Sequence, residues 1–142
     1  MAPWTKIQIK DPKGENMLDC YDEEGVLRLQ EILGDAGKKI VENFHATSPD
    51  FAKLIVNFGY GELYTRQTLS DKEKELAAVS SLVSQGKTGL PLKAHIQGML
   101  NVGWKMNDVI ELFIFLTGYV GLPTTVEAFK TLQEIQSANE DK

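Results

Sequence analysis

The strongest constraint on the fold is the spacing of apolar residues, which is helical along nearly the whole chain. Side chains three, four and seven residues apart share one face of a helix, and this spacing first occurs at Val26, Leu29, Ile32 and Leu33. Similar patterns continue to about residue 136, whereas the two-residue alternation typical of strands never extends over a useful length. The sequence therefore predicts an all-α bundle of about six or seven helices.

Prolines and glycines divide the chain. They interrupt residues 1–20, which we interpret as an N-terminal arm, and residues 21–142 then form one helical domain. Ser48 followed by Pro49 is typical of a helix start. The helix after it is expected to bury Phe51, Leu54, Ile55 and Phe58. Residues 108–119 are apolar almost all round, which predicts a central helix.

Charge and cysteine content exclude several classes of function. The net charge is −5 and no basic stripe occurs, which argues against a nucleic-acid partner. Cys20 is the only cysteine, so an intrachain disulfide or an all-cysteine metal site cannot form. The apolar stretch from Val109 to Leu122 is too short to span a membrane, and the N-terminus lacks the pattern of a signal peptide. We therefore expect a cytoplasmic protein without a bound metal.

His95 is the first candidate for chemistry, because it lies one helical turn from both Leu92 and Met99. It is either a hydrogen-bonded core histidine or a general acid or base, since histidine titrates near neutral pH. Glu111 lies within the most apolar helix, where an unpaired carboxylate would be costly. Glu75 is expected to be solvated.

Glu62 and Arg66 are four residues apart, which is the spacing of a salt bridge if the segment is helical. They form either a surface pair or a clamp for an anion, because arginine binds carboxylates in a bidentate manner. The chain has only one other arginine, Arg28, and this scarcity slightly favours a special role.

Several short segments, taken together, resemble the carboxymuconolactone decarboxylase family. The resemblance extends over about residues 21–136, in order and at nearly constant spacing. Its segments are Tyr21-Asp-Glu-Glu-Gly25, Arg28, Leu33-Gly34-Asp35, Phe58-Gly-Tyr-Gly-Glu-Leu-Tyr-Thr-Arg66, Leu92-Lys-Ala-His95, Leu100-Asn-Val-Gly103, Glu111 and Tyr119-Val-Gly-Leu-Pro123.

The resemblance implies a cofactor-free decarboxylase of a small carboxylated lactone, assembled as a homo-oligomer that is a hexamer or a trimer. His95 would donate the proton and Arg66 would hold the carboxylate. Glu62 or Glu111 would orient a reacting group or relay a proton. Further contacts with the substrate would come from Phe58, Tyr64 and Glu75. In the sequence pattern, Glu75 falls close to the position of the proton-relay glutamate of the related alkylhydroperoxidase D branch.

That related branch also needs two cysteines before the histidine, and Thr88 and Pro91 occupy those positions here. Thiol peroxidase activity is therefore not expected. Two departures from the decarboxylase pattern leave other readings open: Gln97 replaces an arginine and Phe115 replaces a histidine. The alternatives are an enzyme of the same fold acting on another small acid, and a non-catalytic oligomeric binding protein.

Overall fold

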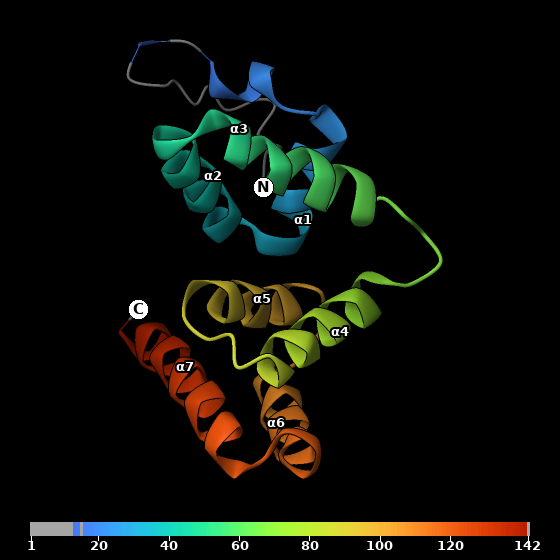
Figure 1. Ribbon diagram of the computed structural model, residues 1–142, viewed down its shortest axis with the longest axis vertical. Helices are drawn as coiled ribbons and strands as arrows, with labels where there is room; N and C mark the ends of the chain where they lie inside the picture. The colour runs from blue at the N-terminus through green and yellow to red at the C-terminus, as the bar shows by residue number, and fades with distance from the viewer. Residues whose placement is uncertain (1–12, 15, 142) are drawn as a thin grey trace. The chain divides into compact units, whose positions relative to one another are not determined.

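The computed structural model describes residues 13–14 and 16–141, and these residues contain seven α-helices and no strand (Figure 1). The predicted all-α fold is confirmed. The predicted arm lies largely outside the described residues. The helices are divided between two compact units, Met1–Ser70 and Asp71–Lys142.

The first unit contains three α-helices and two other helical segments. They are the 3-10 helix η2 (Met17–Cys20), α1 (Glu23–Leu33), α2 (Asp35–Thr47), α3 (Pro49–Lys53) and the π-helix η3 (Leu54–Leu63). Helix α1 packs along η3 and against α2. The predicted inner face of α1 is confirmed, since its four apolar residues are all buried. The predicted start at Ser48 is also confirmed, because its Oγ accepts a hydrogen bond from the Phe51 amide at 3.2 Å.

The prediction for the face of α3 and η3 was wrong. Phe51, Leu54 and Phe58 are 47%, 60% and 53% exposed, whereas Ala52, Val56 and Tyr60 are buried. Apolar residues lie on both sides of this segment, so helical spacing alone could not select the covered side. The contact with α1 selects it.

Gly25 allows α1 to approach the backbone of η3. A Cβ atom at this position would lie 2.5 Å from the carbonyl oxygen of Val56. We expect Gly25→Ala to lower the free energy of unfolding by about 1–3 kcal/mol, because backbone must move to relieve the overlap. Urea denaturation measures this change.

Gly118→Ala is the matched control for Gly25→Ala. Gly118 is also helical, but an added Cβ would have no neighbour within 4 Å. This variant should gain up to about 1 kcal/mol from the higher helix propensity of alanine. Equal effects at the two glycines would contradict a close approach of α1 to η3.

A tyrosine–histidine contact connects Tyr21, two residues before the start of α1, to the last turn of α2. The Tyr21 hydroxyl lies 2.6 Å from Nδ1 of His45, and Tyr21 is buried. Burial, with a smaller effect of Cys20, raises the pKa of Tyr21 from 10.0 to about 12. The phenol therefore keeps its proton at neutral pH and can donate it to the imidazole.

The second unit consists of α4 (Asp71–Ser84), α5 (Leu90–Asn101), α6 (Met106–Val120) and α7 (Leu122–Glu140). Helix α4 packs against α5, and α6 packs against α7. At the core, the Phe113 and Phe129 rings meet edge to face with their centroids 5.4 Å apart. Among the described residues, no helix is both long and apolar enough to cross a membrane.

The prediction that the apolar helix is buried all round was also wrong. On α6 only Val109, Phe113 and Leu116 are buried, and Glu111 is exposed. On the other side, Phe115 and Tyr119 are 63% and 77% exposed. Within this unit α6 has neighbours on one side only, so its remaining apolar surface is not explained by packing inside the unit.

Candidate active site

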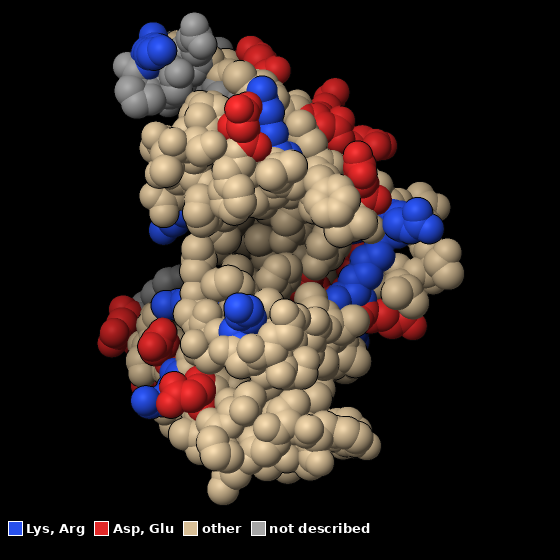
Figure 2. Space-filling view, in the orientation of Figure 1, with Lys and Arg blue, Asp and Glu red and all other residues tan. Residues whose placement is uncertain are grey.

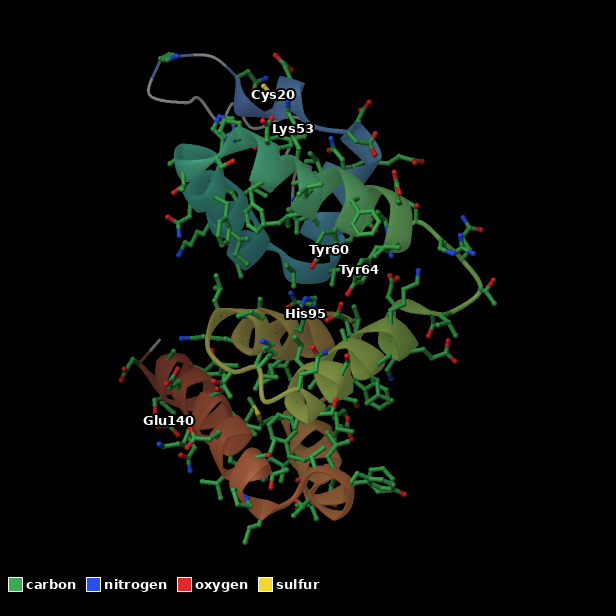
Figure 3. All side chains as sticks on the ribbon, in the orientation of Figure 1. Cys20, Lys53, Tyr60, Tyr64, His95 and Glu140 are labelled. Atoms are coloured by element: carbon green, nitrogen blue, oxygen red, sulfur yellow. The ribbon has the colours of Figure 1, made fainter. Side chains whose placement is uncertain are left out.

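The central feature of the second unit is a contact between a glutamate and a histidine. Glu75 lies on α4 and His95 on α5, where Figure 3 labels it. The Glu75 Oε2 atom is 2.8 Å from His95 Nδ1. The glutamate side chain is 0% exposed and the histidine side chain 22% exposed. A fully buried carboxylate is thus paired with an imidazole that solvent still reaches.

The packing of α4 against α5 explains why these two residues meet. Glu75, Val79 and Val83 are spaced by four residues and are all buried, so the glutamate occupies the inner face of α4. His95 adjoins the buried residue Ile96 on α5. The expectation that Glu75 is solvated was therefore wrong. Its four-residue spacing from Val79 and Val83 was the signal in the sequence that could have placed it inside.

The contact determines how the imidazole can act. An ionised carboxylate only accepts hydrogen bonds, so Nδ1 of His95 must carry the proton that Glu75 accepts. This arrangement leaves Nε2 as the nitrogen that can exchange a proton with a bound molecule. Burial of a carboxylate is costly without a partner, and His95 supplies one. The pair can therefore serve as an oriented acid or base.

Four other predicted site residues belong to the first unit. Phe58 and Glu62 on η3 are exposed, and Arg66 is exposed in the loop that follows. The π-helix ends at Leu63, so the helical spacing that suggested a Glu62–Arg66 pair does not extend to Arg66. Tyr64 is partly buried.

The Tyr64 ring stacks on Tyr60, with centroids 4.6 Å apart and planes 15° from parallel. Figure 3 labels both residues. Tyr60 is only 5% exposed, so the stack has one fixed, buried ring and one ring that is accessible in part. Sequence reasoning did not single out Tyr60, although its spacing of four residues from Tyr64 is compatible with contact on a helix.

The positions that depart from the family pattern have ordinary surroundings. Gln97 donates a hydrogen bond to Oδ1 of Asn101 at 3.0 Å along α5. Phe115 lies in the exposed part of α6, beside Tyr119. In the described part of the chain, no group of three or more His, Cys, Asp or Glu side chains is arranged to hold a metal ion.

Comparison with known proteins assigns the same region to one family. A model of the carboxymuconolactone decarboxylase family matches residues 49–134, a range that includes both Glu75 and His95. The chain is also 25% identical to the 4-carboxymuconolactone decarboxylase of Acinetobacter baylyi over 114 residues, which are 80% of this chain and 84% of that protein.

Proposed function

Since the chain belongs to the carboxymuconolactone decarboxylase family, we propose that it removes CO2 from a small carboxylated unsaturated lactone of the 4-carboxymuconolactone type, without a cofactor. The observation that carries this proposal is the contact between buried Glu75 and partly exposed His95. It supplies an oriented proton donor inside the region that the family model matches.

The reaction requires a group that can accept an electron pair and a group that can donate a proton. When the carbon–carbon bond to the carboxylate breaks, its electron pair spreads onto the lactone carbonyl, and hydrogen-bond donors at that oxygen stabilise the transition state. A carbon atom then takes up one proton. Nε2 of His95 donates that proton while Glu75 holds Nδ1, and solvent restores it afterwards.

The remaining roles rest on the family resemblance. We propose that Arg66 binds the substrate carboxylate, which a guanidinium can hold in a bidentate manner. Phe58 and Tyr64 contribute apolar and aromatic contacts, and Glu62 or Glu111 orients a reacting group or relays a proton. The exposure of Glu62 and Glu111 makes Glu75 the better supported partner of His95.

Release of CO2 from 4-carboxymuconolactone by the purified protein tests the proposal. We expect turnover well above that of a sample without protein. Absence of CO2 release would contradict this substrate assignment. Turnover of a different small keto acid or lactone would then favour the alternative of a related enzyme, for which the departures at Gln97 and Phe115 are the motivation.

We also propose that the protein is a homo-oligomer, a hexamer or a trimer. Five large apolar side chains at the end of α6 and the start of α7 are 49–77% exposed: Ile114, Phe115, Tyr119, Leu122 and Val126. On the face that Figure 2 shows, charged side chains do not cover the end of the second unit where α6 meets α7. Large exposed apolar side chains that are gathered near one junction of two helices are typical of an interface between proteins.

The oligomer proposal predicts an assembly that depends on this apolar surface. Sedimentation at micromolar concentration should show a species larger than a monomer, and Tyr119→Glu should shift it toward the monomer, because a buried charge is costly. Lys130→Glu, on an exposed part of α7, is the control and should leave the assembly intact. A monomeric parent protein would contradict the proposal.

A further inference from the structure

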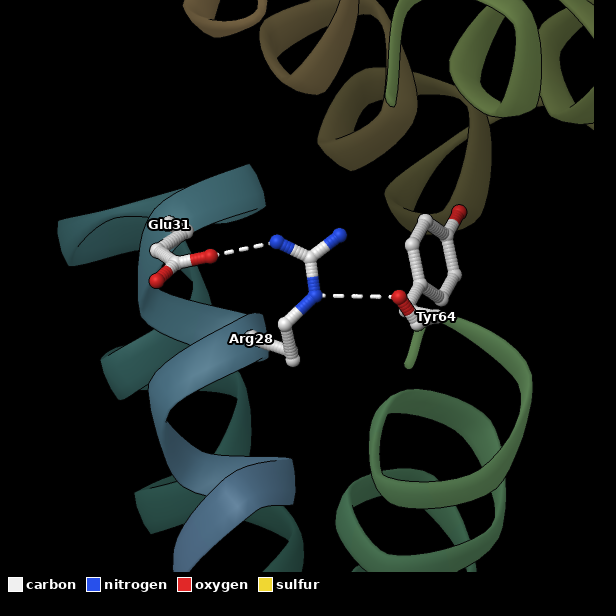
Figure 4. A network of polar contacts seen from close by, with 3 residues as sticks. All are labelled: Arg28, Glu31 and Tyr64. Atoms are coloured by element: carbon white, nitrogen blue, oxygen red, sulfur yellow. Dashed lines mark hydrogen bonds and ion pairs between the residues drawn. The ribbon is translucent and has the colours of Figure 1, made fainter. Parts of the chain in front are cut away.

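We propose that Arg28 is a positioning residue for Tyr64, and that it acts by holding the backbone at the end of η3. The inference rests on the proposed function in one respect, the contact of Tyr64 with substrate. Arg28 lies on α1, 36 residues before Tyr64, and its side chain is 19% exposed. Its Nε donates a hydrogen bond to the Tyr64 carbonyl oxygen at 3.0 Å (Figure 4).

The end of η3 needs such a donor. The last carbonyl groups of a helix have no partner within the helix and must be satisfied by other groups. The Thr65 hydroxyl donates to the Gly61 carbonyl oxygen at 2.7 Å, which is a local contact. The bond from Arg28 comes from another helix, so it holds the end of η3 in place against α1.

Glu31 orients the guanidinium for this task. It lies three residues after Arg28 on α1 and pairs with the Nη1 end (Figure 4). The pair occupies one side of the planar guanidinium, while Nε on another edge is directed to the Tyr64 carbonyl. A guanidinium presents its donors in a fixed geometry, so the ion pair limits the directions in which Nε can point.

Tyr64 is therefore held by contacts to its ring and to its backbone. The face of its ring stacks on the buried ring of Tyr60, and its backbone carbonyl is bound by Arg28. Loss of the carbonyl contact would free the backbone that carries the ring while the stacking partner stays in place. A substrate that contacts Tyr64 would then have to order this segment when it binds, which weakens binding.

Arg28→Met tests the inference, since methionine retains part of the apolar stem and removes the donor. We expect faster amide exchange in a peptide covering residues 59–66, with peptides from residues 71–141 unchanged. We also expect KM for the lactone to rise about 3- to 10-fold, which corresponds to the net contribution of one ordinary hydrogen bond, while kcat stays within about 2-fold.

Two controls separate positioning from loss of charge. Lys38→Met removes one positive charge from the same unit, on α2, where Lys38 pairs with Glu42. Glu31→Gln removes the ion pair with Arg28 but leaves the Nε donor. Lys38→Met should leave exchange in residues 59–66 unchanged. Glu31→Gln, which keeps the Nε donor but loses the ion pair that orients it, should accelerate exchange there less than Arg28→Met does.

Unchanged exchange in Arg28→Met would overturn the inference, whatever the activity. Faster exchange with an unchanged KM would also overturn it, because Arg28 would then be a helix cap with no role in binding. If the parent protein releases no CO2, the proposed function fails, and the exchange experiment still decides whether Arg28 positions the Tyr64 segment.

Discussion

We expect His95→Gln to lower kcat for CO2 release by about 10²- to 10⁴-fold, the usual range for removal of a general acid or base. Glutamine keeps a polar side chain at the position but cannot deliver a proton near neutral pH. His95 is partly exposed and lies beside buried residues of α5, so the substitution leaves no large cavity. The helical circular dichroism of the variant should stay close to that of the parent protein, whereas its urea midpoint should fall, because buried Glu75 loses its imidazole partner.

The second histidine provides the matched control. His45 belongs to the first unit and contacts Tyr21, so His45→Gln removes an imidazole of equal size from a different environment. Its kcat should remain within about 2-fold of the parent value, because it has no place in the proposed proton transfer. Full turnover by His95→Gln would show that His95 is not the proton donor.

Glu75→Gln should lower kcat by about 10- to 10³-fold without unfolding the protein. The amide has the size of the carboxylate, but it removes the negative charge that stabilises the imidazolium and fixes the proton on Nδ1. Glu134→Gln is the control, because Glu134 is an exposed carboxylate of the same unit, 4.0 Å from Lys93. It should change kcat by less than about 2-fold.

The double variant decides whether the two residues act as one unit. If Glu75 works through His95, the combination of Glu75→Gln and His95→Gln should be no slower than His95→Gln alone, because the effects of coupled residues are not additive. Independent roles would instead give the product of the two losses. A Glu75→Gln variant with full activity would show that the contact is structural only.

The sequence predicted elements whose evidence is local. Helical spacing at Val26, Leu29 and Ile32 was enough to identify the buried face of α1, and Ser48 before Pro49 was enough to identify the start of α3. His95 was found because a titratable side chain occurs among apolar helical positions. The family pattern, too, is a property of residue order and spacing. Such features can be identified without knowing which helices pack together.

Only the tertiary structure decided which sides of the helices are covered. The spacing of apolar residues allowed two buried sides for α3 and η3, and contact with α1 buried Val56 rather than Phe58. On α6 the apolar pattern overestimated burial, because neighbours in its unit cover one side. The π-helical form of η3 was not predicted either.

The same limit applies to the candidate site. The sequence by itself identified His95 as a candidate for proton transfer and excluded thiol chemistry of the Cys-x-x-Cys type, because Cys20 is the only cysteine. It did not determine that His95 would meet Glu75, 20 residues earlier, or that Arg28 would bind the Tyr64 carbonyl 36 residues later. The physical reason is that helical periodicity indicates which side of a single helix is apolar, whereas a hydrogen bond between two helices depends on how the two helices pack together.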